Sequence, residues 1–200
     1  MKYIKEVLNL SVEELREWYF KNHATCKECF VNVNLCHGNN TNTKSITNAK
    51  ISYLDALEVA LCFGWIDSTK WKDDKGRCIQ RFSPRKKNSK WTELNKARAQ
   101  RLIKLQLMTA SGEKAYEQAQ KFYISEEILC ELKKNTIAYK NFNAMPELYR
   151  RIRIDNIQRY RHNSQQFHYR IHKLISNCEK NIIYGNWNDN GKLITCETYE

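Results

Sequence analysis

The sequence predicts an α+β fold, in which a small antiparallel sheet with N-terminal helices is followed by a mostly helical C-terminal half. Short segments that alternate apolar and polar residues, as half-buried strands do, occur between residues 29 and 82. Two of these segments flank a glycine-containing turn, which predicts a hairpin. From residue 109 to residue 178 the apolar residues instead recur at helical spacing.

The N-terminal part begins with a well-marked helix. Ser11 is followed three residues later by Glu14, which is the spacing of a capping box. Leu15 and Tyr19 then recur at helical spacing and predict one buried face. Residues 29–36 alternate between apolar and polar side chains, so we expect a strand there.

A second helix and the hairpin follow. Ser52 is a typical helix N-cap, and Gly64 lies where a left-handed residue would end that helix. Residues 65–71 and 77–82 are rich in aromatic and β-branched side chains and flank a turn that contains Gly76. This pattern predicts an antiparallel hairpin.

The rest of the chain reads as helices. Ser89 is the expected N-cap of a long helix. Phe167, Ile171, Leu174 and Cys178 predict the buried stripe of the last helix. After the helix that begins at Ser89, four helices are expected at residues 109–121, 125–134, 146–161 and 164–178, and the last of these carries that stripe.

These elements suggest three parts. We expect an α+β core domain over residues 1–122, a helical part packed on it over residues 123–184, and a tail over residues 185–200. The sequence leaves open whether this tail holds a short strand.

The composition limits the compartment and the partners. No apolar stretch approaches the roughly 18 residues that a membrane span needs, so no transmembrane segment is expected. The N-terminus shows no export signal, and the eight cysteines are expected to be reduced thiols, so we expect a cytoplasmic protein. The formal net charge of +12 favours anionic partners.

Several segments together resemble the YdeI/OmpD-associated family, also labelled bacteriocin-protection proteins. They are Ala60-Leu61-Cys62-Phe63-Gly64-Trp65-Ile66-Asp67, Gln80-Arg81-Phe82-Ser83-Pro84-Arg85, Ser89-Lys90-Trp91, Asn95, Arg101-Leu102, Met108-Thr109-Ala110-Ser111-Gly112 and, after the first helix, His23-Ala24-Thr25. The resemblance covers roughly residues 10–180. It implies a non-enzymatic stress or antimicrobial-peptide-protection protein that binds an anionic ligand or a protein partner, and it brings no catalytic residue set.

The hairpin and the residues after it form the first candidate site, for an anion. Arginine offers paired donors that match phosphate or carboxylate, and a helix N-terminus favours negative charge. The candidate residues are Trp65, Asp67, Arg81, Arg85, Lys90, Trp91 and Asn95. An alternative stays open, in which Asp67 pairs with Arg81 across the hairpin while the tryptophans pack in the core.

Arginines of the C-terminal helices form a second candidate site, for nucleic acid. They are interleaved with tyrosines, a combination that suits a phosphate backbone or single-stranded bases. The candidate residues are Arg150, Arg151, Arg153, Arg159, Arg161 and Arg170. The alternative is that these arginines form the solvated outer face of two helices.

An enzyme is the third hypothesis, with Asp67 as acid or base on a small phosphorylated or carboxylated substrate. The sequence has no phosphate-cradling glycine loop, no HExxH and no serine elbow, so we lean towards a protein that is not an enzyme and expect no cofactor. Cys26, Cys29, Cys36 and His37 resemble part of a zinc site. A strand would hold Cys29 and Cys36 about 20 Å apart, so we predict no metal.

Overall fold

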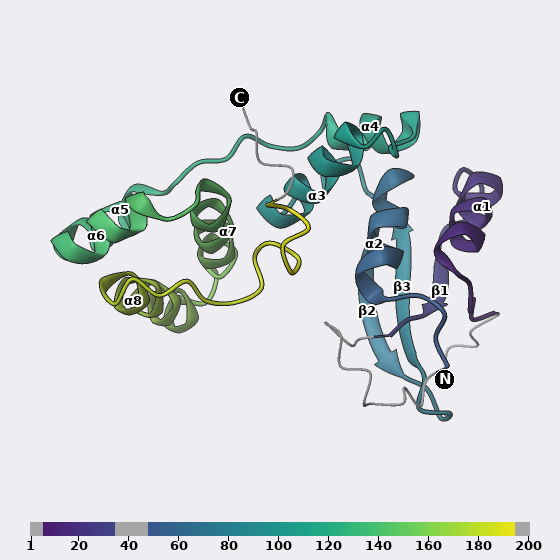
Figure 1. Ribbon diagram of the computed structural model, residues 1–200, viewed down its shortest axis with the longest axis horizontal. Helices are drawn as coiled ribbons and strands as arrows, with labels where there is room; N and C mark the ends of the chain where they lie inside the picture. Colours follow the sequence, from purple (N-terminus) through teal and green to yellow (C-terminus); the bar gives the residue numbers. More distant parts are fainter. Residues whose placement is uncertain (1–5, 35–47, 195–200) are drawn as a thin grey trace. The chain divides into compact units, whose positions relative to one another are not determined.

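The computed structural model describes residues 6–34 and 48–194 of the chain (Figure 1). Within these ranges the chain forms a three-stranded antiparallel sheet and eight α-helices. It divides into two compact units, of which the first holds residues 1–89 and 99–119 and the second holds residues 90–98 and 120–200. The predicted α+β class, with a small sheet and a mostly helical C-terminal half, is confirmed.

The sheet of the first unit has the order β1-β3-β2. Its strands are β1 (Cys29–Asn32), β2 (Trp65–Lys72) and β3 (Cys78–Pro84), and both pairings are antiparallel. The predicted hairpin is therefore correct, and its turn uses Gly76 at φ +73°. Strand β1 ends earlier than predicted because Asn34 leaves β3 and hydrogen-bonds with residues 51 and 53 instead.

Helices α1 (Val12–Asn22) and α2 (Tyr53–Cys62) have the predicted caps. The Ser11 hydroxyl accepts from Glu14 N, and Ser11 N donates to the Glu14 carboxylate at 2.8 Å. At α2, the Ser52 hydroxyl accepts from Asp55 N at 3.1 Å. Beyond the end of α2, Gly64 has the predicted left-handed backbone, with φ +75°.

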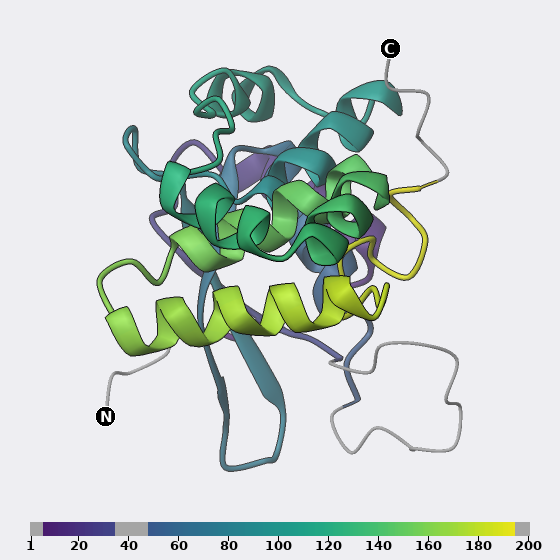
Figure 2. The ribbon, with the colours of Figure 1, turned by 90° about the vertical axis from the view of Figure 1, so that its left-hand side faces the viewer.

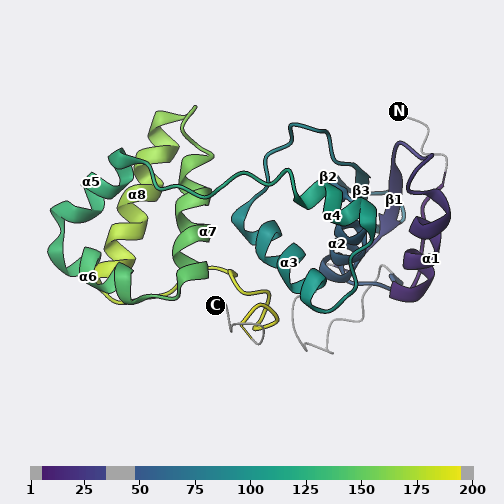
Figure 3. The same ribbon diagram turned by 90° about the horizontal axis from the view of Figure 1, so that it is seen from above.

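The core of the first unit lies between these helices and the sheet (Figure 3). Burying a large apolar side chain contributes about 1.5–3 kcal/mol, so this cluster holds the elements together. Its largest buried residues include Leu15, Tyr19, Leu57, Leu61, Trp65 and Phe82.

Helix α3 (Glu93–Lys104) begins later than the predicted cap at Ser89. The Thr92 hydroxyl accepts from Asn95 N at 2.9 Å and so acts as the cap, whereas Ser89 accepts from the Arg85 guanidinium at 3.1 Å. The prediction at Ser89 was wrong because that hydroxyl is used by a neighbouring side chain. Helix α4 (Ala110–Tyr116) starts as predicted but is shorter than the expected 109–121.

The second unit contains four helices after residue 120, which Figure 2 shows in green to yellow-green. They are α5 (Glu126–Lys134), α6 (Thr136–Ala144), α7 (Glu147–Gln158) and α8 (Ser164–Glu179). Helix α8 packs against the other three, and its predicted stripe is buried. Helix α6 was not predicted, because only Asn135 separates it from α5. The Asn135 side chain caps α6 by accepting from Ala138 N. No helix in the described part of the chain is both long and apolar enough to cross a membrane.

The units divide the chain differently from the predicted parts. Residues 90–98 belong with the helical unit instead of the α+β core. The segment after residue 184 is more than a tail, because Trp187, Asp189 and Leu193 are buried. Arg98 holds this segment through Asp189 with two hydrogen bonds of 2.7 and 2.8 Å. That the helical part packs on the core stays a prediction.

Asp189→Asn should destabilise the second unit by about 3 kcal/mol, because breaking a buried ion pair leaves the remaining charge uncompensated. The free energy of unfolding, measured by urea denaturation, tests this. Asp74→Asn in the exposed hairpin turn removes the same charge and should change the stability by less than about 0.5 kcal/mol. Equal changes in the free energy of unfolding for the two variants would contradict a stabilising role of residues 185–194.

Candidate functional site

The hairpin residues of the predicted anion site are already engaged within the first unit. Trp65 is only 1% exposed and packs edge-on against Tyr19, with ring centroids 5.1 Å apart. The Asp67 carboxylate accepts from the Tyr53 hydroxyl at 2.9 Å. The tryptophan therefore belongs to the core, as the structural alternative proposed.

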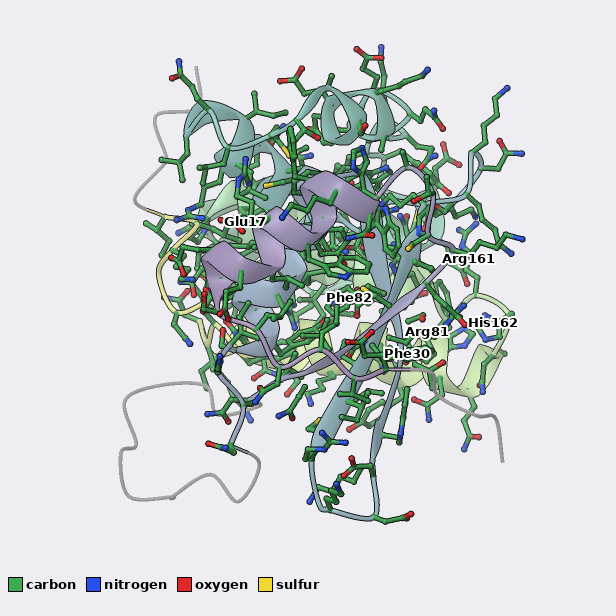
Figure 4. The ribbon with its side chains drawn as sticks, turned by 90° about the vertical axis from the view of Figure 1, so that its right-hand side faces the viewer. Glu17, Phe30, Arg81, Phe82, Arg161 and His162 are labelled. Atoms are coloured by element: carbon green, nitrogen blue, oxygen red, sulfur yellow. The ribbon has the colours of Figure 1, made fainter. Side chains whose placement is uncertain are left out.

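Arg81 pairs with a carboxylate other than the one predicted. Its Nε donates to Glu28 at 2.8 Å, whereas Asp67 stands opposite Phe82 in the strand register. Figure 4 labels Arg81 beside Phe30, its partner in register on β1, and Phe82 nearer to α1. The Asp67–Arg81 pair of the structural alternative was wrong, because Phe82 stands opposite Asp67 and Arg81 binds Glu28.

The remaining candidates at this site fall in both units. Arg85 of the first unit donates to Ser89, while Lys90, Trp91 and Asn95 belong to the second unit. Trp91 is buried there, and Asn95 accepts from the Arg98 guanidinium at 2.7 Å. Each of these side chains has a structural role in its own unit except the exposed Lys90.

Three of the six predicted C-terminal arginines form ion pairs. Arg151 binds the buried carboxylate of Glu93 at 2.6 Å. Arg159 pairs with Asp155 at 3.0 Å. Arg161 lies 3.7 Å from Glu127. Their charges are compensated, so they support the structural alternative.

The other three arginines, Arg150, Arg153 and Arg170, lie over aromatic rings, as Arg151 and Arg161 also do. Arg170 lies 3.8 Å from the centroid of Tyr160, and Arg153 lies 5.1 Å from that of Tyr184. We call these three residues the stacked arginines. Among the described residues none of them forms an ion pair, and the Nε atom of each is buried without a hydrogen-bond partner.

Positive charge gathers around Tyr184. The Lys173 ammonium lies 5.4 Å from the centroid of its ring. Burial raises the pKa of Tyr184, and the charges of Arg153 and Arg170 act in the opposite direction. Half-buried cations without a counter-ion have lost hydration that an anion can replace. This surface is therefore suited to binding an anion.

A pocket of about 280 Å³ in the second unit is less suited to an anion. Arg161 and His168 line it together with Glu127. The Glu127 carboxylate lies 3.7 Å from Arg161 and 3.9 Å from His168. A negative charge is thus already present beside both basic groups.

One contact in the first unit joins two residues that the sequence did not single out as a site. His23 Nε2 lies 3.1 Å from the Ser111 hydroxyl, although 88 residues separate them. Both residues occur in the segments that carry the family resemblance. That was the one signal for them, because nothing in a single sequence shows that these segments meet.

Four of the described cysteines are buried, and burial makes their thiols hard to ionise. Burial raises the pKa of Cys29 to about 12 and that of Cys178 to about 11. It also raises the pKa of the Cys62 and Cys78 thiols. Over residues 6–34 and 48–194, no three His, Cys, Asp or Glu side chains form a metal-binding group. Cys36 and His37, which belong to the zinc alternative, lie outside the described residues.

Among the six cysteines that the structure describes, N-ethylmaleimide at neutral pH should label the exposed Cys130 first and the half-buried Cys26 next, because a thiolate must be both formed and accessible to react. Cys29, Cys62, Cys78 and Cys178 should stay protected until the protein unfolds. A labelling time course followed by peptide mass spectrometry tests this order. Labelling of Cys29 as fast as that of Cys130 would contradict it.

Comparison with known proteins gives one match. A family model described as a domain of unknown function, DUF8412, matches residues 8–115. No curated protein and no solved structure matches the chain. The resemblance to the YdeI/OmpD-associated family stays a prediction.

Proposed function

The chain belongs to DUF8412, a family of domains of unknown function, and we propose that the second unit of the chain binds single-stranded nucleic acid through the stacked arginines. The surface lies beyond residue 115, where the family match ends. The proposed binding is therefore a property of this chain and is not inferred from the family.

The observation that carries the proposal is the division of the six arginines into two groups. Ordinary surface arginines find carboxylates or water, as Arg151, Arg159 and Arg161 do. The three stacked arginines instead keep an unpaired charge next to aromatic rings. A phosphate would supply the missing counter-charge and accept from the guanidinium groups.

The spread of the charge favours a polymer over a small anion. Residues 146–180 contain eight lysines and arginines but three carboxylates, and the stacked arginines lie on both α7 and α8. A chain of phosphates can contact several of them at once, which a single phosphate cannot.

The aromatic side chains favour a single strand. Tyr169 is 59% exposed and precedes Arg170, and Tyr160 is half-buried beneath the same arginine. Exposed rings beside cations are the elements that stack unpaired bases while the backbone is neutralised. Bases within a duplex are already stacked and would leave Tyr169 without this role.

The other hypotheses have less support. The hairpin anion site loses its central cation, because Arg81 is neutralised by Glu28. The enzyme hypothesis relied on Asp67, whose carboxylate accepts a hydrogen bond from the Tyr53 hydroxyl. A stress or peptide-protection role of the YdeI/OmpD-associated type is compatible with nucleic-acid binding and stays a proposal.

The test compares two double variants that remove the same charge. Arg153→Gln/Arg170→Gln removes two stacked arginines, and Arg159→Gln/Arg161→Gln removes two exposed, ion-paired ones. Binding of a fluorescein-labelled oligothymidylate is followed by fluorescence anisotropy between about 50 and 200 mM salt. We expect the first variant to lose about tenfold in affinity and the second to change less than about threefold.

The salt dependence gives a second readout. Each phosphate contact on a single strand contributes about 0.7 to the slope of log K against log salt, so the first variant should lower that slope by about 1.4. Circular dichroism shows whether both variants keep the wild-type helices. Equal losses in the two variants, or no binding by the wild type, would contradict the proposal.

A further inference from the structure

We propose that Ser111 is a nucleophile activated by His23, and that this pair in the first unit transfers acyl groups from carboxylic esters. The inference is independent of nucleic-acid binding, because it rests on other residues in the other unit. A hydroxyl becomes reactive when a base accepts its proton and a third group orients the base. The first unit supplies all three parts.

The backbone determines which nitrogen of His23 carries the proton. Nδ1 lies 2.8 Å from the carbonyl oxygen of Tyr19, and a carbonyl can accept but not donate. Nδ1 is therefore the protonated nitrogen of the neutral ring, and Nε2 is left with its lone pair. Nε2 lies 3.1 Å from Ser111 Oγ, so the hydroxyl donates to it. This is the arrangement of a serine and its general base.

The imidazole is held in place by its surroundings. His23 is the C-cap residue of α1, and its own N–H also donates to the Tyr19 carbonyl, at 2.8 Å. Its ring packs against Phe63, with centroids 5.2 Å apart, and its carbonyl accepts from the Trp65 indole. Fixed orientation of the base reduces the ordering needed when a substrate binds.

Two glycines place Ser111 opposite that imidazole. A Cβ on Gly112 would lie 2.3 Å from the Cys62 carbonyl oxygen, and one on Gly64 would lie 2.8 Å from the Ser111 carbonyl oxygen. The start of α4 can therefore approach the end of α2 only because both side chains are absent. This close contact leaves the Ser111 residue exposed, where a substrate can reach it.

A second serine–histidine contact in the same chain lacks this arrangement. Ser164 Oγ lies 3.3 Å from His168 Nδ1, but that same nitrogen lies 2.8 Å from the Ser164 carbonyl oxygen. The carbonyl requires Nδ1 to carry the proton, so it cannot accept one from the hydroxyl. Ser164 therefore also lies beside a histidine, but that histidine cannot act as its base. It serves as an internal control.

The reaction balances with water as the second substrate. Ser111 Oγ bonds to the ester carbonyl carbon as its proton passes to His23 Nε2, and the bond to the alcohol breaks as that proton moves to the leaving oxygen. Water then attacks the acyl-serine, and its proton returns through Nε2 to Ser111 Oγ. Ester and water become acid and alcohol, and both residues are restored.

A fluorophosphonate probe tests the nucleophile directly. Ser111 Oγ would bond to phosphorus and release fluoride, and mass spectrometry of the peptides locates the adduct. We expect labelling at Ser111 but not at Ser164 in the wild type. His23→Gln should slow it at least about tenfold, since a positioned general base contributes about 10²–10⁴-fold. His168→Gln is the matched control and should leave the rate unchanged.

Labelling of the wild type at Ser111 and not at Ser164 is a comparison that needs no variant to fold. If hydrolysis of p-nitrophenyl acetate is lost in Ser111→Ala, the result extends from labelling to esters. The proposal is overturned by absence of an adduct at Ser111, by equal labelling of Ser164, or by a labelling rate that His23→Gln leaves unchanged.

Discussion

The carbonyl oxygen of Cys62 fixes the geometry on which the first unit depends. Thr109 donates to it through its N–H at 3.0 Å and its hydroxyl at 2.6 Å. The same oxygen faces the space where Gly112 lacks a side chain. One acceptor thus sets where α2 ends, where α4 begins and how closely the two approach. The position of Ser111 relative to His23 follows from that approach.

Carboxylates determine which cations of this basic chain remain available. Two buried carboxylates bind three cations: Glu93 binds Lys96 and Arg151, and Asp189 binds Arg98. A buried charge without a partner is costly, so these pairs are constrained by folding. The stacked arginines are only half-buried, and aromatic rings supply part of their stabilisation instead. Among the described residues, the stacked arginines of α7 and α8 are thus half-buried cations that folding leaves without a carboxylate.

Local chemistry made much of the fold predictable, whereas contacts between distant segments did not. Caps at Ser11 and Ser52, the left-handed Gly64 and the hairpin turn each depend on a few neighbouring residues, and the structure has all of them. The sequence could not show that the hairpin anion site is neutralised, because Glu28, which binds Arg81, lies 53 residues away and just before β1. The six arginines were found from composition and spacing, but which three lack a carboxylate depends on partners that no local pattern reveals.

The segment after α8 is what turns separate arginines into one surface. Tyr184 brings its ring to Arg153 of α7 and Lys173 of α8, and the chain then turns at Gly185, whose backbone is left-handed with φ +74°. Asp189 anchors the same segment to Arg98. A buried ion pair at one end of the segment therefore supports a half-buried cationic surface at the other. Loosening this anchor would also free the tyrosine around which the cations gather, so the stability of the second unit and the proposed binding depend on the same few residues.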